Sequence, residues 1–178
     1  VIPKELDPPS TAQSAIGARD VQATALQMAM VASATVIEGV LMRPYVVAEV
    51  LDASGRRVKG PDAGPWVDGP FTAQAVSETT ATALADLMVK VVQEGTGTRA
   101  QIPGVVVGGK TGTADPGEEV SPHVWFVGFA STPGPRAGPP VPRVAVAVVL
   151  PNAGRGLTGG RDAAPIAKAV MQAALEPQ

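Results

Sequence analysis

Apolar residues recur with two different periods along this chain, and the period predicts which segments are helices and which are strands. A helix is predicted over 21–38, because Asp20 is a suitable N-cap and Gly39 a suitable stop. Its apolar stripe runs through Leu26, Met30 and Val31. Apolar residues also occupy most other sides of this helix, which is typical of a buried helix. Residues 1–19 contain several prolines and are expected to form an extended lead-in.

A second helix has the clearest two-sided pattern in the chain. Ser77 is a suitable N-cap, Glu78 is an acidic residue in the first turn, and Gly95 ends the helix. Its apolar stripe consists of Ala81, Leu84, Met88 and Val91. The spacing of these residues predicts an amphipathic helix with one inward face.

A hairpin is predicted between the two helices. Residues 45–51 read as a strand, residues 52–55 (Asp-Ala-Ser-Gly) as a turn, and residues 56–59 as the return strand. A loop rich in Pro and Gly follows at 60–70, with Trp66 as its expected anchor on the domain.

The last third of the chain changes to strand patterns. Three strands are predicted over 105–113, 124–130 and 143–150, and both faces of these strands are apolar, so the sheet is expected to be covered on both sides. The connections at 114–123 and 131–142 contain no helical pattern, whereas parallel strands need a longer crossover. The three strands are therefore predicted to form an antiparallel meander.

A C-terminal helix is predicted to cover one side of this meander. Asp162 is its expected N-cap and Pro165 lies in its first turn. The expected inward residues are Ile166, Val170 and Ala173. The predicted fold class is therefore α+β, an antiparallel sheet with flanking helices.

Composition narrows the possible functions. The chain has 178 residues, of which 45% are hydrophobic, enough for the core of one domain or a large piece of one. A net charge of −2 argues against a nucleic-acid partner, which needs clustered Lys and Arg. No apolar run reaches the ~18 residues of a membrane span, and no cysteine is present for disulfides or thiol catalysis. The chain begins at Val1 without a signal peptide, so it is expected to be a piece of a longer protein.

One cation and two hydroxyls stand at the end of the first predicted strand of the meander. The cation is Lys110, and the hydroxyls are those of Thr111 and Thr113, with Gly112 between them. We call residues 110–113 the Lys-Thr-Gly segment. On a strand, the ammonium can attract a carboxylate, the hydroxyls can donate to an anion, and the N–H of Thr113 can hold a developing oxyanion. An exposed edge here can also bind an extended peptide by strand addition. The structural alternative is an exposed lysine at a strand end, with threonines present for their β-propensity.

Residues 104–111 also match the phosphate-loop pattern G-x-x-x-x-G-K-[ST]. That motif requires a helix to begin at the lysine, so that amides and the helix dipole face the phosphates. Three valines fill the supposed loop, and residues 112–117 (Gly-Thr-Ala-Asp-Pro-Gly) cannot start a helix promptly. Nucleotide binding is therefore disfavoured.

The Lys-Thr-Gly sequence is one of three signatures of penicillin-recognising serine enzymes. Further blocks match in order along the chain, at 14–17, 24–29, 41–45, 95–100, 109–114, 123–130 and 159–165. Together they cover nearly the whole chain. The chain resembles the C-terminal portion of the transpeptidase domain of class B penicillin-binding proteins, which has the β-lactamase/transpeptidase-like fold.

This resemblance implies a parent protein that cross-links peptidoglycan stem peptides by acyl transfer through a serine ester. It implies that the Lys-Thr-Gly segment lines the site of the donor peptide and of β-lactams, and that no metal or organic cofactor is needed. The parent would act at the extracytoplasmic face of the bacterial membrane, anchored by an N-terminal segment, with no membrane contact by this chain. The N-terminal part of the same protein would be its partner.

Two elements of the family's chemistry are missing from the sequence. A Ser-x-x-Lys nucleophile is excluded, because none of the five lysines has a serine three residues before it. A Ser-x-Asn element is excluded because the residue two positions before the only asparagine, Asn152, is Leu150 and not a serine. Residues 1–178 are therefore expected to be a partial transpeptidase domain without a catalytic residue of its own. The alternative is a non-catalytic ligand-binding or interaction module on a transpeptidase scaffold, which the missing motif favours only if the chain is complete.

Several other residues were candidates for chemistry. His123 is the only histidine and is expected to be structural rather than a base, since no acidic partner is identifiable beside it. The acidic loop at 115–119 is expected to be a solvated turn rather than a metal site. Arg155 and Arg161 are expected to flank the cleft.

Overall fold

The computed structural model describes residues 7–17, 21–47, 50–59, 72–114, 121–132 and 141–176. Its helices are α1 (Pro8–Ala15), α2 (Ala25–Val36), α3 (Glu78–Gln93) and α4 (Ala164–Leu175), with a 3-10 turn η1 (Thr98–Ala100) and a π-helical turn η3 (Gly159–Ala163). Its strands are β1 (Val40–Met42), β2 (Val50–Leu51), β3 (Arg57–Lys59), β4 (Thr72–Gln74), β5 (Val106–Ala114), β6 (His123–Thr132) and β7 (Val141–Leu150).

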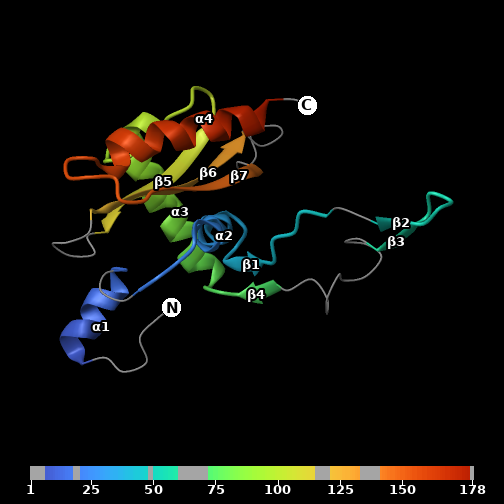
Figure 1. The fold of residues 1–178 in the computed structure, drawn as a ribbon, viewed down its shortest axis with the longest axis horizontal. Coiled ribbons are helices and arrows are strands. Elements are labelled where there is room, and N and C mark those ends of the chain that lie inside the picture. Colours follow the sequence, from blue (N-terminus) through green and yellow to red (C-terminus); the bar gives the residue numbers. More distant parts are fainter. Residues whose placement is uncertain are drawn as a thin grey trace.

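The central sheet is the antiparallel meander β5-β6-β7. Its register places Gly112 opposite Trp125 and Phe126 opposite Val148. Helix α4 lies along one face of this sheet, and α2 and α3 lie on the other side (Figure 1). The predicted α+β class, the meander and the coverage of both faces are confirmed.

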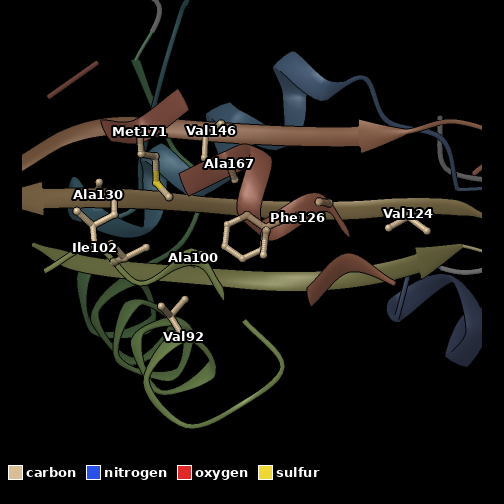
Figure 2. Packing of buried hydrophobic residues seen from close by; sticks show 12 residues of the cluster. Val92, Ala100, Ile102, Val124, Phe126, Ala130, Val146, Ala167 and Met171 are labelled. Atoms are coloured by element: carbon tan, nitrogen blue, oxygen red, sulfur yellow. The ribbon is translucent and has the colours of Figure 1, made fainter. Parts of the chain in front are cut away.

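The main core lies between the sheet and α4 (Figure 2). Phe126 and Met171 are fully buried there, and Ala164 and Ala167 bring the helix backbone close to the strands. The predicted inward face of α4 was wrong. Ile166 and Val170 are 43% and 47% exposed, and Ala173 is exposed as well. The small side chains face inward because they permit a close helix–sheet approach, which branched side chains would prevent.

Two glycines of β5 make room for aromatic rings on opposite faces of the sheet. A Cβ at Gly108 would lie 2.3 Å from Cζ of Phe129, and a Cβ at Gly109 would lie 2.3 Å from Cζ of Phe126. Both phenylalanines are buried. The strand that carries the Lys-Thr-Gly segment is thus fixed from both sides by rings that use the space of missing side chains.

The N-terminal region differs from the expectation of an extended lead-in. Residues Pro8–Ala15 form α1, because the carboxylate of Asp7 accepts from the N–H of Ser10 at 2.8 Å and prolines suit the first turn of a helix. The next helix begins at Ala25 rather than at residue 21. Thr24 is its cap, with Gln27 as the reciprocal partner of a capping box. Asp20, the predicted cap, lies outside the described residues.

Helix α2 is also less buried than its composition predicted. Ala32, Ala34 and Thr35 are buried, whereas Leu26 and Val31 are at least half exposed. Elements of the described chain cover only one side of this helix, so the all-round apolar pattern does not correspond to all-round burial.

The predicted hairpin is present but shorter. β2 pairs with β3 around a turn in which Oδ1 of Asp52 accepts from the N–H groups of Ser54 and Arg56, each at 2.9 Å. Residues 45–47 are not in a strand, and the loop at 60–70 with Trp66 lies outside the described residues. The pairing of β1 with β4 was not predicted, because it joins segments about thirty residues apart.

Helix α3 has the predicted boundaries. Ser77 caps its start by accepting from the N–H of Thr80 at 3.2 Å, and the helix ends at Gln93, shortly before Gly95. Ala81 of the predicted stripe is buried and Met88 and Val91 are half-buried, but Leu84 is exposed rather than inward, and Val92, outside the stripe, is buried instead.

Candidate functional site

The Lys-Thr-Gly segment lies on β5, as predicted. β5 is an outer strand of the described three-stranded sheet, so one of its sides is open. No helix begins at Lys110, because the strand continues to Ala114. The structural requirement of a phosphate loop is therefore not met.

The open side of β5 carries specific backbone groups. The side chain of Lys110 is exposed, and its Nζ donates to the carbonyl oxygen of Thr111. This contact places the carbonyl of Thr111 on the open side. In an antiparallel strand both polar groups of a residue point to the same side, and that side alternates along the strand. The N–H of Thr113 therefore also faces the open edge.

The side chains of the segment divide between the two faces of the sheet, since successive residues of a strand point in opposite directions. Lys110 and Gly112 share one face, while Thr111 and Thr113 share the other. A Cβ at Gly112 would meet only Cβ of Trp125, at 3.4 Å, so there is space beside the glycine. Oγ1 of Thr111 lies 2.7 Å from Oγ1 of Thr96, and the two hydroxyls are hydrogen-bonded.

A glycine pair from η3 packs against the back of the segment. A Cβ at Gly159 would lie 3.0 Å from the backbone nitrogen of Gly112 and 2.2 Å from the carbonyl oxygen of Trp125. A Cβ at Gly160 would lie 2.0 Å from the carbonyl oxygen of Thr96. Only glycines permit this close approach of backbone to backbone.

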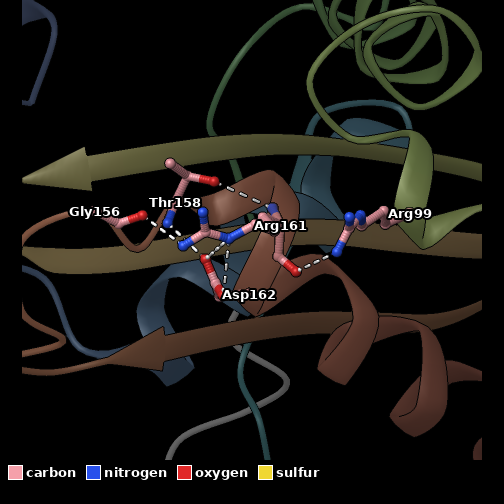
Figure 3. A network of polar contacts seen from close by, with 5 residues as sticks. All are labelled: Arg99, Gly156, Thr158, Arg161 and Asp162. Carbon is pink, nitrogen blue, oxygen red and sulfur yellow. Dashed lines mark hydrogen bonds and ion pairs between the residues drawn. The ribbon is translucent and has the colours of Figure 1, made fainter.

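The turn that carries these glycines is closed by a polar network (Figure 3). Oγ1 of Thr158 accepts from the N–H of Arg161 at 3.2 Å, and Oδ2 of Asp162 accepts from the N–H of Thr158 at 2.7 Å. Thr158 is thus the cap of η3, with Asp162 as its reciprocal partner, whereas α4, which Asp162 was predicted to cap, has no side-chain cap. The N–H of Thr158 is the main cause that lowers the pKa of Asp162, assisted by Arg161 and opposed by desolvation.

Arg161 is engaged within this network. Its Nε lies 3.2 Å from Oδ2 of Asp162, and its guanidinium also donates to the carbonyl of Gly156. Its own carbonyl accepts from the guanidinium of Arg99 at 3.2 Å (Figure 3). Arg155 is exposed on the same loop. A cleft-flanking role for the two predicted arginines stays a prediction.

His123 joins two neighbouring strands at one end of the sheet. Its Nδ1 accepts from the N–H of Asn152 at 3.0 Å, which ties the start of β6 to the loop after β7. This contact supports the predicted structural role. The acidic loop at 115–119 lies outside the described residues. Within the described ranges, no three His, Asp or Glu side chains gather where a metal ion could be held.

Thr96 is the residue of this region to which the sequence alone assigned no role. It lies between Gly95 and Gly97, within a block that matched the family, so its neighbourhood was visible. Its contact with Thr111 spans 15 residues along the chain and follows no helical or strand period. Only the packing of η3 and α3 against β5 brings the two hydroxyls together.

An antiparallel sheet between helices, with a Lys-Thr-Gly strand at its open edge, defines the class of penicillin-recognising transpeptidase-like domains. A family model for the penicillin binding protein transpeptidase domain matches residues 7–172, and the chain belongs to this family, in its class B branch. The predicted family and fold are thereby confirmed.

Individual relatives agree with this assignment. Peptidoglycan D,D-transpeptidase PbpA of Mycolicibacterium smegmatis is 38% identical over 177 residues, covering 96% of this chain and 33% of the relative. Stage V sporulation protein D of Bacillus subtilis is 34% identical, covering 97% and 26%. The ceftriaxone acyl-enzyme complex of penicillin-binding protein A from M. tuberculosis superposes with a TM-score of 0.80 at 33% identity, covering 99% of this chain and 38% of that one. The chain thus spans about a third of the length of its first relatives.

No helix in the described part of the chain is both long enough and apolar enough to cross a membrane.

Proposed function

We propose that this chain supplies the Lys-Thr-Gly strand of the donor-peptide and β-lactam site in a peptidoglycan D,D-transpeptidase. One observation carries the proposal: the ammonium of Lys110 contacts the carbonyl of Thr111 on β5, an outer strand, and strand alternation directs the N–H of Thr113 to that same edge. A cation and an oriented backbone donor are the groups that an acyl-transfer site needs on the side opposite its nucleophile. The transpeptidase relatives and the acyl-enzyme structure of a neighbour support the same assignment.

The chemistry divides between this chain and the polypeptide that carries the nucleophile. A serine oxygen attacks the carbonyl carbon of the donor peptide, the C–N bond to the leaving amine breaks, and that amine takes up a proton. Lys110 attracts the carboxylate of the donor or the antibiotic. The N–H of Thr113 donates to the oxygen that becomes negative, and the amide at the nucleophile provides the second donor.

The chain alone is proposed to be inactive. It contains no Ser-x-x-Lys and no Ser-x-Asn, so it has no activated hydroxyl that could form the ester. The front part of the same protein would provide both. The assembled domain would act at the extracytoplasmic face of the cell membrane, with peptidoglycan stem peptides as substrates.

A fluorescent penicillin tests this proposal on the natural full-length polypeptide and on the 178-residue chain. We expect a covalent adduct, seen by denaturing gel and intact mass, on the full-length polypeptide alone. Lys110→Ala in the full-length polypeptide is expected to slow acylation about ten- to hundredfold, because a hydrogen bond to a charged group is lost. Lys90→Ala is the matched control, since Lys90 is an exposed lysine on α3 and lies outside the Lys-Thr-Gly segment. An adduct on the short chain, or equal rates for the two lysine variants, would contradict the proposal.

A further inference from the structure

Three segments that are distant in sequence meet behind the Lys-Thr-Gly segment. They are the loop after α3, the strand β5 and the turn η3. We propose that Thr96, in the loop after α3, is a positioning residue. The end of α3 and the turn η3 hold Thr96 in place, and Thr96 in turn fixes Thr111 and thereby the edge of β5 on which acyl transfer depends. This inference rests on the proposed function and assigns a residue that acts through the strand rather than on the substrate.

The first step is that Thr96 itself is fixed. The N–H groups of Gly95 and Gly97 both donate to the carbonyl of Val91, at 3.1 and 2.9 Å. A Cβ at Gly95 would lie 2.9 Å from the Cα of Val91, so the turn around Thr96 lies tightly on the end of α3. A residue between two amides that share one carbonyl has little backbone freedom.

The second step is that η3 packs against the backbone of Thr96 from the other side. The missing Cβ of Gly160 leaves the space that the carbonyl of Thr96 occupies. The guanidinium of Arg99 reaches the carbonyl of Arg161 and ties η1 to the same turn (Figure 3). Hydrogen bonds between Thr158, Arg161 and Asp162 close η3 itself.

The third step is the contact with the strand. The hydroxyls of Thr96 and Thr111 lie 2.7 Å apart, and Gly159 packs on the backbone nitrogen of Gly112. Thr111 is half-buried on this face. Its hydroxyl is therefore used to attach β5 to the loop, while its carbonyl faces the open edge beside Lys110. A rotation of the backbone at Thr111 would turn that carbonyl and displace the N–H of Thr113, which lies one peptide unit further along the strand.

The test compares Thr96→Val with Thr96→Ser in the full-length polypeptide. Valine keeps the shape and removes the hydroxyl, whereas serine retains it. Thr98→Val is the matched control, because Thr98 is an exposed threonine two residues further on, whose hydroxyl makes no hydrogen bond within the described chain. Hydrogen exchange of a peptide covering 108–114 and the second-order rate of acylation by fluorescent penicillin are measured for each.

We expect Thr96→Val to raise exchange in 108–114 and to lower the acylation rate, each by about two- to tenfold, the worth of one hydrogen bond. Exchange in 124–130 and the melting temperature should stay near wild type, and Thr96→Ser should restore both readouts. In a Thr111→Val background, Thr96→Val should add nothing further to the exchange, because the bond is already absent.

Four results would overturn the inference. They are unchanged exchange in Thr96→Val, an equal effect of Thr98→Val, faster exchange over the whole sheet with a lower melting temperature, and faster exchange without slower acylation. If the wild type takes up no penicillin at all, the proposed function fails. The exchange comparison then still decides whether Thr96 holds the strand.

Discussion

Replacing Gly108 with alanine probes how the strand of the candidate site is seated in the sheet. The new Cβ would lie 2.3 Å from Cζ and 2.5 Å from Cε1 of Phe129, whose side chain is only 2% exposed. Such distances are far inside van der Waals contact, and the buried ring has no solvent to turn into. Overpacking of this kind costs about 1–3 kcal/mol. For a domain of this size each kcal/mol lowers the melting temperature by about 2–4 °C, so a decrease of about 2–12 °C is expected by scanning calorimetry.

Gly112→Ala is the matched control for this experiment. Gly112 lies on the same face of the same strand, but its new Cβ would come no closer than 3.4 Å to another atom. The melting temperature of the Gly112→Ala variant should differ from that of the wild type by less than about 2 °C. Phe129→Leu, destabilising alone, should recover part of the stability lost in Gly108→Ala, because the smaller side chain frees the space of the ring. Equal shifts for the two alanine variants, or strictly additive losses in the double variant, would refute the packing argument.

Two further predictions concern the ends of helices. Thr24→Ala should destabilise the chain by about 1 kcal/mol in urea unfolding, because it removes the cap of α2, whereas Thr24→Ser should retain most of the stability; equal losses would exclude the capping box as the cause. The pKa of Asp162 lies below its ordinary value of 3.8, so its carboxylate stabilises the fold above that pH and the contribution is lost as the pH falls through the lowered pKa. Asp162→Asn should therefore flatten the acid side of the stability curve, and parallel curves for wild type and variant would contradict this.

The meander could be predicted because its signals are local. Each strand carries apolar residues on both faces, and the connections between strands are too poor in helical pattern for a parallel crossover. The turn at Asp52 and the cap at Ser77 were predictable for the same reason, since one side chain close in sequence satisfies the free backbone groups.

Choices between competing local signals could not be made from the sequence. Thr158 and Asp162 are both good caps, and the structure uses them as a reciprocal pair. The turn η3, which leads into α4, packs Gly160 against the carbonyl of Thr96, and this is a tertiary contact. The inward face of α4 was assigned to Ile166, Val170 and Ala173, whereas close approach to the sheet selected the alanines at 164 and 167. Packing decided in each case between options that the local pattern leaves equal.

The alternation of side chains along β5 explains why a short segment can serve both recognition and attachment. In the proposed site, a peptide lying along the open edge would meet the carbonyl of Thr111 and the N–H of Thr113, together with the ammonium of Lys110 from one face. The side chain of Thr111 projects to the other face, where Thr96 and η3 hold it. If the side chains of Lys110 and Thr111 pointed to the same face, the contacts that fix the strand would compete with the ligand for space. The order Lys-Thr-Gly thus places the ammonium of Lys110, proposed to bind the ligand, and the anchoring side chain of Thr111 on opposite faces of one strand, and Gly112 leaves the face of Lys110 open.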